Sequence, residues 1–227
     1  MAETKVKNSQ LEPHGSGMAA IVGNSTATVI DNADQWIPVQ GLVSTTHLDN
    51  FTYTAGNTTT ISGVADAGGG EIRVITGTNH EASIGDPIVI TNTANYDGLY
   101  VVTSVPGLTQ FQVTAAYVGD SLVGDVYLPD RLTVSMSDEY TLQYSLSVTA
   151  ANNNDVLDFT IGINDGTVNE LERPRSFSAI DQGVIAATWF YELTAGDILW
   201  LAAANTTAAN NLTIQYGTWG AMGARSE

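Results

Sequence analysis

The sequence predicts an all-β protein, and three observations support this fold class. Thr, Val, Ile and Tyr dominate segments of strand length, and turn residues recur about every ten positions, a spacing typical of a sandwich or barrel. Apolar and polar residues alternate in several of these segments, which gives each strand one apolar face. No stretch shows a sustained helical period with capping residues.

The clearest strands lie in the second half of the chain. Leu132–Met136 and Thr141–Val148 alternate between apolar and polar residues, and residues 155–163 form a mainly apolar run. A hairpin turn is expected at Asn164–Asp165–Gly166, because Asn and Gly tolerate a positive φ. The last strands are predicted at Ile198–Ala202 and Leu212–Tyr216.

A change in composition marks an inserted domain. Residues 63–70 (GVADAGGG) predict a flexible leading segment, and Pro129–Asp130 marks the end of the insertion. Five short strands with tight turns between them can close into a small barrel. These strands are predicted at Glu71–Thr76, Pro87–Thr91, Leu99–Val105, Phe111–Thr114 and Gly124–Leu128. We therefore expect a tail over residues 1–17, a discontinuous sandwich over 18–63 and 130–227, and an inserted barrel over 64–129.

Charge and composition argue against several classes of function. The net charge is -17 and the only lysines are Lys5 and Lys7, so a nucleic-acid partner is not expected. The chain has no cysteine, which excludes a disulfide framework, a thiolate zinc site and a cysteine nucleophile. Polar residues follow the two lysines and no run of about 18 apolar residues occurs, so neither a signal peptide nor a membrane partner is expected.

No catalytic or cofactor signature is found, and we expect neither enzymatic activity nor a cofactor. His14, His47 and His80 show no metal-ligand spacing and no Ser/His/Asp pattern. Asp155 and Asp158 lie three positions apart on a predicted strand, so they point to opposite faces and do not form a glycosidase pair. The oxygen-rich turn at residues 152–155 leaves calcium binding as an alternative, although its spacing is not that of an EF-hand.

Residues 80–113 combine tight turns with short apolar strands. Gly85–Asp86 and Asp97–Gly98 make the turns, and alternating apolar residues can fill a barrel. The characteristic residues are His80, Gly85–Asp86, Ile88–Ile90, Tyr96–Gly98, Tyr100–Val102 and Phe111. This set resembles a small β module that is common in phage structural proteins. The family has no known catalytic role, so the resemblance implies a place in the virion rather than chemistry.

The segments on either side of the insertion carry a second resemblance. Its residues lie in Glu139–Val148, Phe159–Asn164 and Leu193–Leu201, the last with a Gly196–Asp197 turn before an apolar strand. They resemble the tumour-necrosis-factor and C1q-like jelly roll of trimeric phage head fibres and tail-fibre tips. The resemblance implies a jelly-roll sandwich, a homotrimer and a location on the particle surface. The Gly-rich stretch 217–223 departs from a plain closing strand.

The resemblance also suggests contact residues. Large aromatic side chains bury much area, so they are the expected trimer contacts, with ordinary core packing as the alternative for each. They are Tyr140, Tyr144, Trp189, Tyr191, Trp200 and Tyr216. The tail is expected to bind capsid or tail proteins of the phage and so to anchor the protein to the virion, a mobile chain end or an expression remnant being the alternative. Its anchoring residues would be Lys5, Val6, Lys7 and Leu11.

The leading hypothesis is therefore a non-enzymatic virion surface protein, either a head fibre, a decoration protein or a tail fibre. A carbohydrate- or receptor-binding module is the alternative, because loop-rich β sandwiches often bind sugars through exposed aromatic residues. Tyr96, Tyr117 and Trp219 are the candidates to face a host surface glycan. A polysaccharide depolymerase is a third hypothesis.

Overall fold

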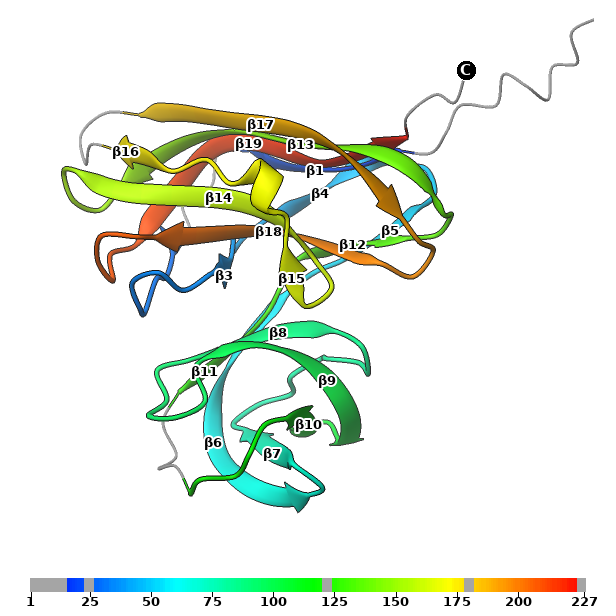
Figure 1. Ribbon diagram of the computed structural model, residues 1–227, viewed down its shortest axis with the longest axis vertical. Coiled ribbons are helices and arrows are strands. Elements are labelled where there is room, and N and C mark those ends of the chain that lie inside the picture. The colour runs from blue at the N-terminus through cyan, green and yellow to red at the C-terminus, as the bar shows by residue number, and fades with distance from the viewer. Residues whose placement is uncertain (1–15, 23–26, 120–123, 178–181, 224–227) are drawn as a thin grey trace, which may run out of the picture.

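The computed structural model describes residues 16–22, 27–119, 124–177 and 182–223. For residues 16–22 and 43–47 it describes the backbone only. Every element described is a strand except the single 3₁₀ turn η2 (Asn169–Leu171), so the predicted all-β class is confirmed. Two antiparallel sheets form a sandwich, and a closed barrel lies beyond one of them (Figure 1). No helix in the described ranges is long and apolar enough to cross a membrane.

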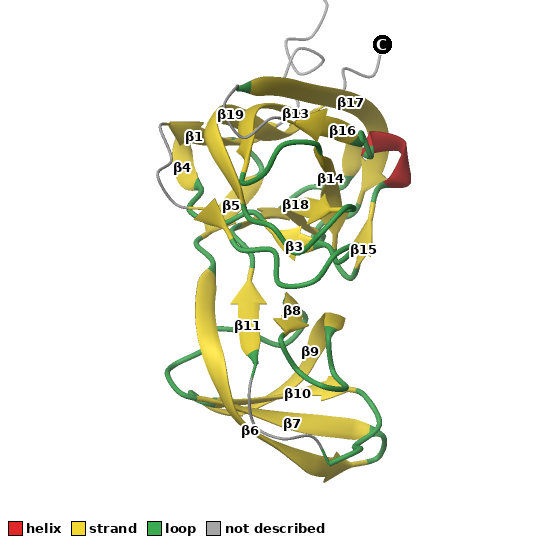
Figure 2. Ribbon diagram, turned by 90° about the vertical axis from the view of Figure 1, so that its left-hand side faces the viewer, coloured by secondary structure: helices red, strands yellow, loops and turns green. Residues whose placement is uncertain are grey.

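Sheet 1 forms the outer layer of the sandwich, on the side away from the barrel (Figures 1 and 2). Its strand order is β17–β13–β19–β1–β4, and β2 pairs with β19. The bounds are β1 (Ser16–Val22), β2 (Ala27–Thr28), β4 (Val43–Leu48), β13 (Asp138–Ala150), β17 (Gly183–Leu193) and β19 (Leu212–Gly223). β1 therefore includes the last two residues of the segment expected to be a tail, because Ser16 and Gly17 pair with Met222 and Ala221.

Sheet 2 lies between sheet 1 and the barrel (Figure 2). Its order is β15–β14–β18–β12–β5, with β16 paired to β14 and β3 to β18. The bounds are β3 (Ile37–Pro38), β5 (Phe51–Thr54), β12 (Arg131–Val134), β14 (Asp155–Ile163), β15 (Gly166–Thr167), β16 (Arg175–Phe177) and β18 (Ile198–Asn205). Ile163 pairs with Gly166 and Asn164 has a φ of 51°, which confirms the predicted hairpin turn.

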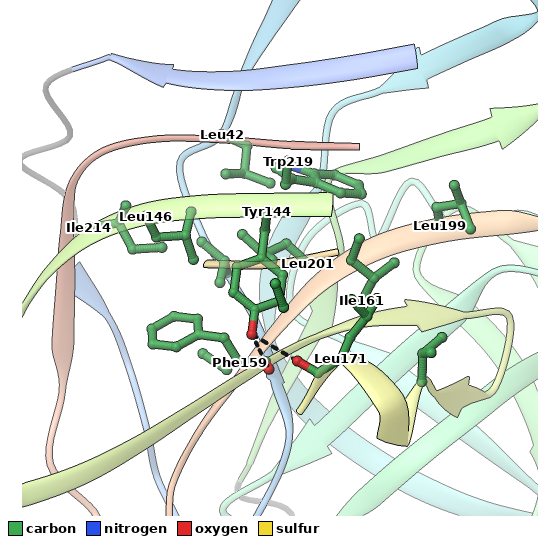
Figure 3. Close-up of a cluster of buried hydrophobic side chains, with 14 of the residues drawn as sticks. Leu42, Tyr144, Leu146, Phe159, Ile161, Leu171, Leu199, Leu201, Ile214 and Trp219 are labelled. Atoms are coloured by element: carbon green, nitrogen blue, oxygen red, sulfur yellow. Dashed lines mark hydrogen bonds between the residues drawn. The ribbon is translucent and has the colours of Figure 1, made fainter. Parts of the chain in front are cut away.

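The hydrophobic core fills the space between the two sheets. Leu142 and Leu146 point inward from β13, and Phe159 and Leu201 meet them from sheet 2. Tyr144 also points inward, and its hydroxyl shares one hydrogen between the carbonyl oxygens of Phe159 and Leu171, at 3.0 and 2.8 Å (Figure 3). Burial raises the pKa of Tyr144, so the hydroxyl stays protonated and able to donate.

The barrel is a closed ring of six antiparallel strands in the order β10–β7–β6–β11–β8–β9. The bounds are β6 (Asn57–Gly68), β7 (Glu71–Thr76), β8 (Pro87–Thr91), β9 (Gly98–Gly107), β10 (Gln110–Thr114) and β11 (Asp125–Leu128). The sequence missed β6, since residues 63–70 were expected to form a flexible segment. Gly63–Gly68 instead belong to β6 and pair with β7, and only Gly69 and Gly70 make the turn. The barrel strands thus begin at Asn57 rather than at residue 64.

A two-stranded ribbon joins the barrel to sheet 2. Thr54 at the end of β5 pairs with Arg131 at the start of β12, and Asn57 at the start of β6 pairs with Leu128 at the end of β11. Between these pairs, a Cβ at Gly56 would lie 2.4 Å from the Leu128 carbonyl oxygen, so only glycine fits. The insertion therefore leaves and rejoins the sandwich at adjacent strands.

Trp200 is buried where the barrel meets the outer side of sheet 2. Its ring covers Gly162, where a Cβ would come within 2.1 Å of the indole, and its Nε1 donates to the Asn164 carbonyl at 3.2 Å. Pro87 and Leu99 from the barrel lie beside the ring. Trp200 therefore connects the two domains within one chain, whereas the sequence analysis placed it at a trimer contact.

Polar contacts also fasten the barrel to the sandwich. The buried guanidinium of Arg131 in β12 lies 2.8 Å from the buried carboxylate of Asp86, just before β8. Asp31, in the segment between β2 and β3, accepts hydrogen bonds from Thr91 and Tyr127 of the barrel. These contacts are specific in geometry, so the barrel is held in one position against sheet 2 rather than carried on a loose linker.

Candidate functional site

The outward side of sheet 1 is the most distinctive surface of the described structure. On β13, Tyr140 to Val148 alternate between buried and outward side chains, so the odd-numbered residues face away from the core. The strand register then forms rows across the sheet, and each row contains one outward residue from β17, one from β13 and one from β19. The rows are Val184–Ser147–Tyr216, Ala186–Ser145–Thr218, Thr188–Gln143–Gly220 and Phe190–Thr141–Met222. We call these four rows the uncharged face.

None of the residues in these four rows carries a charge. The nearest carboxylates on these strands are Glu139 and Glu192, which form the next row beyond Phe190. The chain as a whole has a net charge of -17, so the absence of charge here sets this face apart. Copies of an acidic protein repel each other through most of their surface, and a face without charge lacks that repulsion.

Exposed aromatic residues concentrate at one end of β17. Phe190 is 61% exposed on the uncharged face, while Trp189 and Tyr191 are 44% and 39% exposed on the opposite side of the same strand. Their register partners Leu142 and Tyr140 are buried in the core, so sheet 2 covers the core but stops short of these two side chains. β17 lies at the edge of sheet 1. This edge strand is therefore apolar on both sides.

A shallow hollow of about 330 Å³ lies at the other end of the uncharged face. Ser145, Ser147 and Thr218 supply small hydroxyl side chains, while Val184 and Tyr216 stand beside them and are 59% and 58% exposed. A β-bulge shifts the register of β13 against β19 next to Ser147. Gly217 also lines the hollow, and on the core side of the sheet a Cβ there would lie 2.6 Å from the Leu146 side chain.

The six predicted trimer-contact residues divide into two groups. Tyr140 and Tyr144 are buried between the sheets, and Trp200 is buried under the barrel, so these three do not reach another copy. Trp189, Tyr191 and Tyr216 are exposed on sheet 1. Phe190, Val184 and Met222 are also exposed on sheet 1 and were not predicted. The signal was present, because Val184–Leu193 is apolar at most positions on both sides of the strand, which is typical of a strand covered on both sides.

The predicted glycan-facing residues lie at separate sites. Tyr96 is buried in the barrel, where its hydroxyl accepts a hydrogen bond from the Val118 main chain, and Trp219 is buried in the sandwich core. Both were predicted from side-chain type alone, and burial removes them from a surface site. Tyr117 is 45% exposed. The anchoring residues Lys5, Val6, Lys7 and Leu11 lie outside the described residues.

The buried His80 and Asp155 side chains have structural partners. His80 Nδ1 accepts from the main-chain N–H of Ala82, so Nε2 carries the hydrogen and donates to the Gly107 carbonyl. Asp155 accepts from the Asn152 main chain and the Asn210 side chain. Across the described ranges, no group of three or more His, Cys, Asp or Glu side chains is placed to hold a metal ion.

Asp158 gives a testable pH dependence. Burial raises its pKa above the ordinary value of 3.8, although the main-chain N–H groups of Arg173 and Phe159 bind its Oδ1 and lower it. The folded protein thus holds this proton more tightly than the unfolded chain, so stability falls as pH rises from 3.8 through the raised pKa. Asp158→Asn keeps an acceptor oxygen without the charge. We expect the variant to be the more stable one above this window and the difference to shrink below it, as measured by urea unfolding across the range.

Comparison with known proteins identifies no family. No protein-family model and no curated protein matches the chain. Among solved structures, the dimeric latent PorU from Porphyromonas gingivalis is similar over 74% of this chain and 24% of its own, with 7% sequence identity and a TM-score of 0.31. A similarity at this level carries no argument about function.

Proposed function

We propose that this protein is a non-enzymatic structural subunit of a bacteriophage particle surface, which assembles into a trimer through the uncharged face. The observation that carries the proposal is the exposure of Val184, Phe190 and Tyr216 on a face without charge, in a chain of net charge -17. Exposed apolar residues that group together mark protein contacts, and Phe190 lies next to the exposed Trp189 and Tyr191 on the same strand. The phage setting derives from the resemblance of residues 80–113 to a phage structural module.

The strand order supports a jelly roll. From β12 onward the chain moves from sheet 2 to sheet 1 at β13, back at β14, across again at β17, back at β18, and finally to sheet 1 at β19. This alternation between two four-or-more-stranded sheets is how a jelly roll is wound. The barrel interrupts it between β5 and β12, so the sandwich strands keep their order with the barrel outside.

Because β17 exposes aromatic residues on both of its sides, a ring of copies is favoured and a face-to-face pair is not. A pair of copies stacked on the uncharged face would cover Phe190 but leave Trp189 and Tyr191 exposed on the other side of the strand. In a ring, the edge of one copy lies against the face of the next, which covers both sides. A ring also leaves the barrel free, because it lies on the opposite side of the sandwich (Figure 1).

Phe190→Glu tests assembly directly. The parent protein is expected to show a mass near three times 23.9 kDa by light scattering, and Phe190→Glu a mass near that of one chain. Each added carboxylate would be buried against the uncharged face of the next copy without a cation, and an unpaired buried charge costs several kcal/mol, which raises the dissociation constant at least about a hundredfold. Leu108→Glu adds the same charge at an exposed barrel turn and should leave the trimer intact. A monomeric parent would contradict the proposal.

Attachment to the particle is tested by removing residues 1–15. The deletion stops before β1, because removing Ser16 and Gly17 would also remove strand pairs with β19. We expect the shortened protein to keep its trimeric mass and to lose binding to particles that lack the subunit, because the proposed anchor includes Lys5, Val6, Lys7 and Leu11. Particle binding by the shortened trimer would show that the anchor lies elsewhere.

A further inference from the structure

The outer edge of β17 carries main-chain groups that point away from sheet 1. Among the described residues, β17 pairs only with β13. The Arg175 guanidinium donates to the Val184 carbonyl oxygen, so the main-chain groups of Val184 point away from β13. Main-chain direction alternates along a strand, so those of Ala186, Thr188 and Phe190 also point to the outer edge. Arg175 closes the edge at Val184, and we call residues 186–190 the open edge.

The open edge lacks the features that protect exposed strands in other proteins. Lysine, proline, a β-bulge or an inward charge usually prevents an edge strand from pairing with another chain. β17 keeps one register with β13 along its whole length and carries a single charge, Glu192, near its end. A main-chain group that is buried without a partner costs stability, so whatever covers the open edge has to supply hydrogen bonds.

β13 presents hydrogen-bonding side chains on the uncharged face at a matching spacing. Its outward residues are all polar and without charge, and they are Thr141, Gln143, Ser145 and Ser147. Alternate residues of a strand lie about 6.8 Å apart, and the outward main-chain groups of the open edge have the same spacing. A hydroxyl or an amide both donates and accepts, so each can bond either an N–H or a carbonyl oxygen.

The centre of the uncharged face leaves room for an approaching strand. In the two central rows, β13 is flanked by small residues, with Ala186 and Thr188 on β17 and Thr218 and Gly220 on β19. The larger side chains stand in the two outer rows, and they are Val184, Tyr216, Phe190 and Met222. A strand edge can therefore approach β13 most closely at its middle.

We infer that the open edge of one copy lies along β13 of the next copy, where the polar side chains of β13 hydrogen-bond its main-chain groups. The inference rests on the proposed trimer and names the groups that join edge to face. Thr188 is the middle of the open edge, and Gln143 and Ser145 are the middle of the polar side chains on β13. With Thr188 over either of them, Ser145 lies beside an outward main-chain group.

Thr188→Pro tests the edge, because it removes one outward N–H. Proline is tolerated on an edge strand where its nitrogen faces away from the sheet. In the Phe190→Glu background, we expect Thr188→Pro to keep the urea midpoint of Phe190→Glu, whereas Ala187→Pro removes an N–H that faces β13 and should lower the midpoint. With Phe190 restored, Thr188→Pro should raise the dissociation constant of the trimer at least about tenfold, as measured by light scattering over a dilution series.

Ser145→Ala tests the face, because it removes one hydroxyl and adds no bulk. We expect it to raise the dissociation constant about tenfold, since a main-chain group of the next copy would be buried without its partner. Ser83→Ala removes an exposed hydroxyl from the barrel and should leave the dissociation constant unchanged.

The two variants together separate this pairing from other ways of covering the edge. If the parent is a trimer and only Thr188→Pro weakens it, another strand or other groups cover the edge, and the pairing with β13 is wrong. If Thr188→Pro has no effect, the main chain of the edge takes no part, and the pairing is again wrong while the proposed trimer stands. A parent that is monomeric at all concentrations would contradict the pairing and the proposed trimer together.

Discussion

Replacing Arg131 by Met is expected to lower the free energy of unfolding by about 3–5 kcal/mol, because it leaves the buried carboxylate of Asp86 without its cation. Asp86 would retain only the main-chain N–H of Ser83, at 2.7 Å. Burial lowers the pKa of Arg131, and the charges of Asp86 and Asp130 oppose this, so the cation depends on its two acidic neighbours. Urea unfolding of the parent and the variant measures the change.

Two controls separate the ion pair from a general effect of the substitution. Arg173→Met removes an exposed arginine whose charge lowers the pKa of Asp158, and should lower stability by no more than about 1 kcal/mol. Arg131→Met/Asp86→Asn removes both charges and should recover much of the loss, since a buried ion pair replaced as a whole is often nearly neutral. An Arg131→Met variant as stable as Arg173→Met would mean that the pair does not hold the barrel against sheet 2.

Much of the local structure could be predicted from the sequence. β7 and β8 have the bounds that alternation and flanking turns predicted, and the Asn164–Asp165 turn was predicted from residue type. β6 was missed because glycine and alanine in residues 63–70 have weak strand preference. Its pairing with β7 and β11 supplies the hydrogen bonds that hold it, and pairing over such distances leaves no local pattern.

The candidate site was predicted less well than the strands. Trp189 and Trp200 both lie in apolar strands, and the local pattern does not distinguish them. What separates them is whether another layer covers the side of the strand that carries the tryptophan. The barrel covers Trp200 through residues far away in the sequence, such as Pro87 and Leu99, while β17 lies at a sheet edge with no such layer among the described residues. Only the tertiary arrangement makes that difference visible.

The two tryptophans should therefore respond in opposite ways to truncation. Trp200→Ala is expected to lower the free energy of unfolding by about 3–5 kcal/mol, because the ring is fully buried between sheet 2 and the barrel. Trp189→Ala should lower it by less than about 1 kcal/mol but weaken assembly, since its ring is 44% exposed on the edge strand. The stability of both variants is measured in the Phe190→Glu background, so that subunit association does not contribute, and the assembly of Trp189→Ala is measured by light scattering without the Phe190→Glu change. Equal effects would mean that exposure does not separate the two roles.

Gly162→Ala shows whether the loss at Trp200 comes from the packing described. The new methyl group would stand 2.1 Å from the indole, so Trp200 must leave its place and the variant should lose about 1–3 kcal/mol. In the Trp200→Ala background the same methyl group meets no ring, and the substitution should cost close to nothing. The two changes are therefore expected to be strongly non-additive, as residues in direct contact are. Additive effects would mean that the ring does not lie on Gly162, and the account of the barrel packed on sheet 2 through Trp200 would be wrong.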